Sequence, residues 1–205
     1  KYLTMRKLYL LLATLFFLLQ SSYSVATAIV VDANGGSYKT IQSGLDAANA
    51  GDTVLVKAAT YRETVTFKNS GTKSHYITLL GESGAIIEGI AANRNGIIVL
   101  DKSYIKIIGF EIRYFKGNGT PIGISVRGSG TCIEIRNNKV HHIENSAGNA
   151  HGIAIYGTGK SALTKILVDG NEIHDCQLGS SEALVLNGNV SQFVVSNNLI
   201  HDNDN

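Results

Sequence analysis

The sequence contains only two cysteines, no block of basic residues, and no long apolar segment beyond its first 28 residues. Two cysteines cannot supply a disulfide framework or a cysteine-rich zinc site. Without a basic block in either tail or the interior, nothing indicates a nucleic-acid partner. The 22 glycines follow no three-residue period, which excludes a collagen-like chain. With 44% hydrophobic residues, the 205-residue chain is too apolar to be disordered and long enough to bury a sizeable core.

Residues 1–28 have the pattern of a secretory signal peptide. Residues 5–7 form a short basic start, residues 8–19 are almost entirely apolar, and Ala26-Thr27-Ala28 is a small-x-small cleavage site. The apolar run is shorter than the roughly 20 residues of a membrane-spanning helix, so we expect cleavage after Ala28 rather than an uncleaved anchor. The remaining 177 residues hold 15 Lys and Arg against 16 Asp and Glu. We therefore predict a secreted protein, extracellular or periplasmic, that no membrane holds after cleavage.

The mature chain begins with one predicted helix and continues with short strands. In residues 37–52, Ile41, Leu45 and Ala48 have apolar spacing near 3.6, which indicates a helix. Residues 53–56, 64–67, 76–80 and 85–88 are predicted strands.

From residue 97 onward the sequence repeats itself. Four ten-residue segments align without gaps and start 28, 33 and 27 residues apart, at Ile105, Ile133, Ile166 and Phe193. Between them lie three shorter similar segments, residues 123–128, 152–157 and 183–188. Such repeats predict an all-β fold, a parallel β-helix in which three short strands form each coil and the N-terminal helix caps the stack. A β-sandwich would instead predict hairpin turns without aligned columns. Residues 29–205 are therefore predicted to form one domain.

Stacked coils place equivalent residues above one another. This predicts three inward apolar columns and one column of bend asparagines whose amides bond along the stack. The apolar columns are Ile105, Ile133, Ile166 and Phe193; Ile107, Ile135, Val168 and Val195; and Ile112, Val140, Ile173 and Ile200, while the asparagines are Asn138, Asn171 and Asn198.

The stretch from residue 32 to residue 63 carries a family resemblance, as do the coils of the form Asn-Asn-x-Ile-His-Asp. Within residues 32–63, the segments that carry the resemblance include Ala50-Gly51-Asp52-Thr53-Val54 and Thr60-Tyr61-Arg62-Glu63. The chain resembles the secreted right-handed parallel β-helix proteins of the pectate lyase superfamily, most closely family 9 pectate lyases. The resemblance implies action on an acidic polysaccharide by calcium-assisted β-elimination, with calcium held by Asp side chains on adjacent coils and a Lys base in a later coil. Such coils also occur in epimerases, hydrolases and non-catalytic surface proteins, so the resemblance is specific for fold rather than activity.

Asp175 and Asp202 are the candidate calcium ligands. They occupy equivalent positions 27 residues apart, so stacking would place them about 5 Å from each other. Asp204 follows two residues later. Two carboxylates this close need a cation, a proton or good solvation, and carboxylate oxygens suit calcium. The alternative is that these aspartates only close a turn.

His141, His174 and His201 form another aligned column. The column suggests metal binding or acid–base chemistry, but a structural ladder explains it more economically because the whole motif repeats. Candidate bases are Lys160, Lys165, Arg127 and Arg136, none singled out by spacing, and Tyr156 and Tyr114 could stack on sugar rings.

Two other functions remain open beside the lyase. One is a non-catalytic carbohydrate-binding or surface protein, and the other is a glycoside hydrolase with paired aspartates on neighbouring coils. The sequence ends just after a strand without a terminal cap, so we expect the N-terminal part of a longer protein, a monomer at full length, whose Lys base lies beyond residue 205.

Overall fold

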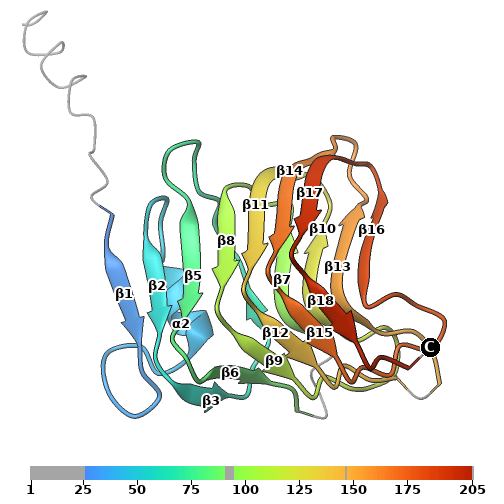
Figure 1. Ribbon diagram of the computed structural model, residues 1–205. Helices are drawn as coiled ribbons and strands as arrows, with labels where there is room; N and C mark the ends of the chain where they lie inside the picture. Colours follow the sequence, from blue (N-terminus) through green and yellow to red (C-terminus); the bar gives the residue numbers. More distant parts are fainter. Residues whose placement is uncertain (1–25, 91–94, 146, 205) are drawn as a thin grey trace, which may run out of the picture.

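The chain folds into three parallel sheets that wind around one core. The computed structural model describes residues 26–90, 95–145 and 147–204, so residues 1–25 of the predicted signal peptide lie outside the described part. The first sheet contains β1 (Ala28–Val31), β2 (Thr53–Val56), β5 (Ile77–Gly81), β8 (Ile105–Ile108), β11 (Gly130–Arg136), β14 (Leu163–Asp169) and β17 (Val190–Ser196), in that spatial order (Figure 1). We call it sheet A.

Two further sheets complete each coil. Sheet B contains β3 (Ala59–Tyr61), β6 (Ala85–Glu88), β9 (Glu111–Arg113), β12 (Lys139–His141), β15 (Glu172–His174) and β18 (Leu199–His201). Sheet C contains β4 (Val65–Thr66), β7 (Asn95–Leu100), β10 (Ile122–Arg127), β13 (His151–Gly157) and β16 (Leu184–Gly188). The chain passes from A to B to C in each turn, and the ladders named above pair in parallel. The predicted parallel β-helix is confirmed.

The strand register also confirms the predicted columns. Ile133 pairs with Ile105 and Ile166, and Val140 pairs with Ile112 and Ile173. All six side chains are at most 1% exposed. Because identical apolar positions superimpose from coil to coil, each added coil buries the same kinds of side chain.

The asparagine column forms the bend between sheets A and B. The Asn171 Oδ1 accepts from the backbone N–H of Asn138 at 3.0 Å, and its Nδ2 donates to the Ile135 carbonyl at 2.9 Å. Asn198 repeats the pattern one coil further, accepting from the backbone N–H of Asn171 at 2.9 Å. Asn138 and Asn171 are 2% and 1% exposed, so these amides satisfy backbone groups that water cannot reach.

The helix is shorter than the sequence predicted. Helix α2 spans Ile41–Ala47, with Thr40 as its N-cap. The Glu63 carboxylate accepts from the backbone N–H groups of Ile41 and Gln42 at 2.8 and 3.0 Å, which satisfies the free donors of the first turn. Tyr38 is not helical because its carbonyl accepts from the backbone N–H of Asp32 beside β1. At the other end, Ala48 leaves helical geometry with ψ 136°.

Helix α2 contacts β1, β2 and β4 at the N-terminal end of the stack (Figure 1). Ile41 and Leu45 are buried there, as expected for a helix that caps the first coil. No helix in the described residues is long and apolar enough to cross a membrane. The two thiols, Cys132 and Cys176, are free.

Candidate functional site

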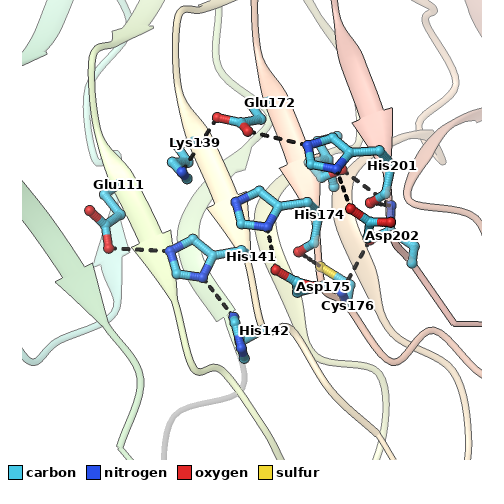
Figure 2. A network of polar contacts seen from close by, with 12 residues as sticks. Glu111, Lys139, His141, His142, Glu172, His174, Asp175, Cys176, His201 and Asp202 are labelled. Carbon is cyan, nitrogen blue, oxygen red and sulfur yellow. Dashed lines mark hydrogen bonds and ion pairs between the residues drawn. The ribbon is translucent and has the colours of Figure 1, made fainter.

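Chemistry-bearing side chains gather on two outer faces of the solenoid. The first is the outer face of sheet B, where the histidine column lies. Register pairs His141 with His174 and His174 with His201. The imidazole rings stack with centroid distances of 4.9 and 5.2 Å and interplanar angles of 8° and 12° (Figure 2). The aligned column predicted from the repeats is therefore present.

Each imidazole of the column binds the next residue in the chain through Nδ1. His174 Nδ1 lies 2.7 Å from Asp175 Oδ2, and His201 Nδ1 lies 2.8 Å from Asp202 Oδ2 (Figure 2). These contacts require Nδ1 to donate, since a carboxylate only accepts. A backbone with φ of 50° at Asp175 and Asp202 turns each carboxylate back onto its own histidine.

The Nε2 atoms face side chains of the preceding coil. His141 Nε2 lies 3.2 Å from Glu111 Oε1, and His201 Nε2 lies 3.2 Å from Glu172 Oε1. At the equivalent place beneath His174 the coil carries Lys139, which pairs with Glu172 instead, at 3.5 Å. Consequently the buried Nε2 of His174 has no hydrogen-bond partner in the described part of the chain. His141 and His174 are thus buried within the column, whereas His201 is partly exposed at its end and lines a hollow of about 410 Å³ with Asp202.

The titration of the column is uneven. Burial lowers the pKa of His141, although the hydrogen bond to Glu111 opposes it. The hydrogen bonds to Asp202 and Glu172 raise the pKa of His201. The hydrogen bond from His174 lowers the pKa of Asp175. Burial and hydrogen bonds within the stack cause these pKa shifts, so the column is a hydrogen-bonded ladder.

The three predicted calcium ligands do not form a donor set. Asp175 and Asp202 are neighbours, joined by a backbone hydrogen bond of 3.1 Å, but each carboxylate is engaged by its own histidine. Asp204 lines a separate hollow of about 410 Å³ with Asn145 and Gln177. Across the described residues, no three His, Cys, Asp or Glu side chains are grouped to hold a metal ion. Calcium binding at these aspartates therefore remains a prediction.

The second face is the outside of sheet C. On β13, the His151 Nδ1 lies 2.8 Å from the Glu182 carbonyl oxygen, and its Nε2 lies 2.9 Å from the Tyr156 hydroxyl. A carbonyl only accepts, so Nδ1 carries a proton. His151 is 3% exposed. In the tautomer that this contact selects, Nε2 can accept from the Tyr156 O–H.

Arg127 extends this pair onto the neighbouring strand. It is the register partner of Tyr156 on β10, and its guanidinium carbon lies 5.1 Å from the centroid of the tyrosine ring. The Arg127 side chain is exposed, and no carboxylate in the described part of the chain forms an ion pair with it. An exposed guanidinium over an aromatic ring, without a carboxylate partner among the described residues, can bind an anion.

A hollow of about 300 Å³ lies beside Arg127. Its lining mixes apolar and polar side chains, namely Asn95, Ile98, Leu100, Thr120, Ile122, Ser125 and Arg127. The Asn95 Oδ1 atom is buried and, within the described residues, has no hydrogen-bond partner.

Burial raises the pKa of Tyr156, and the charge of Glu182 adds to that effect while Arg127 opposes it. The phenol is therefore neutral at physiological pH. It can transfer a proton only if another group takes one, and the bonded His151 Nε2 is that group.

The other side chains that the sequence suggested as bases do not line the hollow. Arg136 lies on sheet A, with Asp169 at 3.6 Å and Glu134 at 3.7 Å as ion-pair partners. Lys160 lies in the turn after β13 and Lys165 on β14, and neither lines the hollow. Only Arg127 among the candidate bases does so.

Sequence reasoning missed His151. A signal was present, since His151 replaces an apolar residue at the position that Ile122 occupies one coil earlier. Its partner Tyr156 was noted only as a ring that could stack on sugar.

No protein-family model matches the chain. A protein of Bacillus subtilis (strain 168) described as uncharacterized protein YwoF is 36% identical over 180 residues, covering 82% of this chain and 38% of that protein. The chain thus spans well under half the length of this relative.

Two solved structures are similar in fold. An alginate lyase from Paenibacillus sp. str. FPU-7 is 16% identical with a TM-score of 0.45, over 86% of this chain and 75% of that one. A pectin methylesterase from Aspergillus niger is 16% identical with a TM-score of 0.43, over 87% and 77%. Likeness at this level carries no argument about activity, and the fold assignment rests on the strand pairing above.

Proposed function

We propose that this protein binds an acidic polysaccharide on the outer face of sheet C and cleaves it by β-elimination. The observation that carries the proposal is the continuous contact from Arg127 through Tyr156 to His151. It joins an exposed cation to a phenol and to a proton acceptor, which are the groups that this reaction requires.

Substrate recognition follows from the charges and the hollow. The guanidinium of Arg127 can bind a uronate carboxylate through two parallel hydrogen bonds. The polar side chains of Thr120 and Ser125, which line the adjacent hollow, can bind sugar hydroxyls. Because β7, β10, β13 and β16 lie side by side, a linear polymer can cross successive coils and meet the same face at each.

The chemistry uses Tyr156 as a relay. Binding of the carboxylate to Arg127 makes the neighbouring C5–H more acidic. The Tyr156 oxygen takes that proton while its own proton passes to His151 Nε2, which lies 2.9 Å away. The C5–H and C4–O4 bonds break, a C4=C5 double bond forms, and the proton returns through the phenol to the leaving O4.

This assignment replaces the later-coil lysine base that the family resemblance implied. It also gives Arg127 the charge-neutralising role that calcium would otherwise fill. The predicted signal peptide is consistent with a substrate outside the cell, and export remains part of the proposal.

The test is formation of unsaturated product, followed by ultraviolet absorbance, from alginate and from pectate. We expect Tyr156→Phe to lower kcat/KM by about 10²–10⁴-fold, because the proton relay is lost. Arg127→Gln should lower it by about 10²–10³-fold, through loss of charge stabilisation. Arg136→Gln, on sheet A at the start of the next coil, is the matched control and should leave the rate unchanged. A chelator arm checks whether calcium contributes.

The rival is a carbohydrate-binding protein without catalysis. Polysaccharide binding that Arg127→Gln weakens, with no product from any uronate polymer, would reject the lyase and keep the binding surface. Equal activity in Tyr156→Phe and wild type would reject the relay.

A further inference from the structure

A buried carboxylate, that of Asp52, has no cationic side-chain partner in the described part of the chain. Asp52 directly precedes β2 and is 5% exposed. Its Oδ2 accepts from the backbone N–H of Asn49 at 2.9 Å. Its Oδ1 accepts from both the backbone N–H and the hydroxyl of Thr27, at 2.9 and 2.8 Å. No Lys, Arg or His of the described residues pairs with it, although a buried charge is costly without a partner of opposite sign.

Thr27 is built into the first coil. Besides its two bonds to Asp52, the Thr27 carbonyl accepts from the backbone N–H of Thr53 at 2.9 Å. Ala28 begins β1 and pairs with Thr53 in the sheet register. Two residues assigned by sequence to the discarded leader therefore form part of the folded domain.

The leader offers three cleavage positions rather than one. Each follows a small-x-small triplet, namely Ser22-Tyr23-Ser24, Ser24-Val25-Ala26 or Ala26-Thr27-Ala28. Cleavage after Ala28 would remove Thr27 and leave Asp52 Oδ1 without either donor. Cleavage after Ala26 would keep both donors and convert the Thr27 backbone nitrogen, 2.9 Å from Oδ1, into an ammonium group.

We propose that the leader is removed between Ala26 and Thr27, and that the new α-ammonium group of Thr27 forms an ion pair with Asp52. The step is hydrolysis by a leader peptidase, in which water breaks the Ala26–Thr27 peptide bond and yields the Ala26 carboxylate and the Thr27 amine. The amine is then protonated and lies as an ammonium group beside Asp52 Oδ1. The inference rests on the predicted signal peptide and is independent of the proposed polysaccharide chemistry.

The charges around Asp52 agree with this arrangement. Burial alone raises the pKa of Asp52, but the backbone hydrogen bonds from Asn49 and Thr27 and the Thr27 hydroxyl outweigh it, so the pKa lies below its usual value. The carboxylate is thus ionised when the ammonium group arrives. Cleavage would convert the existing hydrogen bond from Thr27 N to Asp52 Oδ1 into a charge-assisted one.

The direct test is the N-terminus of the secreted protein. The full sequence is expressed in a secreting bacterial host, and the product is examined by intact mass and N-terminal sequencing. We expect the mature chain to begin at Thr27. A chain that begins at Val25 or Ile29, or that keeps its leader, would overturn the proposal.

A second test measures the ion pair itself. Chains that begin at Ala26, Thr27 and Ile29 are released from a fusion partner without extra residues. We expect the Thr27 form to melt about 3–10 °C above the Ile29 form, since charged hydrogen bonds and strand pairing are retained. The Ala26 form is the matched control, because it keeps every contact but has an amide at Thr27.

The pH profile separates charge from contact. An α-amino group has a pKa of about 8 in the unfolded chain, and pairing with Asp52 should raise it in the folded chain. The stabilisation is then complete below about pH 8 and lost as pH rises through the folded pKa. Only the Thr27 form should show this loss, and Asp52→Asn should abolish it. The same alkaline profile in the Ala26 and Thr27 forms would refute the ion pair.

Discussion

The asparagine ladder provides a quantitative test of how the coils are held together. Asn171 is 1% exposed and sits between two other members of the ladder. Replacing it with Ala removes the acceptor of the Asn138 backbone N–H, a group in a residue that is itself 2% exposed. The donor to the Ile135 carbonyl is lost in the same change.

The expected size follows from those lost partners. A buried donor left unpaired costs about 1–3 kcal/mol, and the emptied side-chain volume adds to that cost. We expect the free energy of unfolding to fall by about 2–4 kcal/mol for Asn171→Ala. For a domain of this size that corresponds to a decrease in Tm of about 5–15 °C.

The assay is urea unfolding followed by circular dichroism, with calorimetry for Tm. Asn171→Leu fills a similar volume without hydrogen bonds, so it separates the polar contribution from the cavity. Asn49→Ala is the control, because Asn49 is exposed and its side chain makes a single bond of 3.3 Å to the Ala47 carbonyl. If the free energy of unfolding of Asn171→Leu lies within about 0.5 kcal/mol of the wild-type value, the hydrogen bonds of the asparagine ladder do not stabilise the stack.

Three further outcomes can be measured on the same protein. In an NMR titration, His141 should show a pKa below that of an ordinary imidazole, because it is buried. His201 should show a pKa above that value, because Asp202 and Glu172 bind it. The reverse order would contradict the ladder. It follows that His141 costs stability as pH falls through the ordinary imidazole pKa, whereas His201 adds stability below that value and loses it as pH rises through its folded pKa. Burial raises the pKa of the Cys176 thiol to about 11, so a thiol reagent at pH 8 should label Cys132 in the folded protein and Cys176 only after unfolding; a Cys132→Ser variant that still labels when folded would refute this. Millimolar calcium tests the predicted calcium site: a rise in Tm that Asp175→Asn abolishes would establish it, and an unchanged Tm would reject it.

The repeats allowed much of the fold to be predicted. Alignment of Ile133 with Ile166 along the sequence became a strand pair in the structure. The same holds for His141 with His174. In a solenoid, register follows directly from sequence alignment, because each coil pairs only with its neighbours. Outside the repeats the prediction was weaker, and the helix expected over residues 37–52 spans only Ile41–Ala47.

The candidate site was less predictable because its partners come from different coils and the variable loops. Glu182, whose carbonyl fixes the His151 tautomer, lies 31 residues away across the variable loop between sheets B and C. Loop lengths differ from coil to coil, so their residues have no column to be aligned with. The aspartates show the opposite case, in which the column was correct but each carboxylate turned to its own histidine.

The sequence by itself determined the repeating coil, its inward apolar columns and its asparagine bends. These features are periodic, and a period can be found along a chain without knowing its path. The tertiary structure alone decided the contacts that break the period. It joined Tyr156 to His151, left Asn95 Oδ1 without a partner among the described residues, and brought Thr27 onto Asp52. Such contacts depend on side-chain direction and on burial, which arise only when separate coils are stacked.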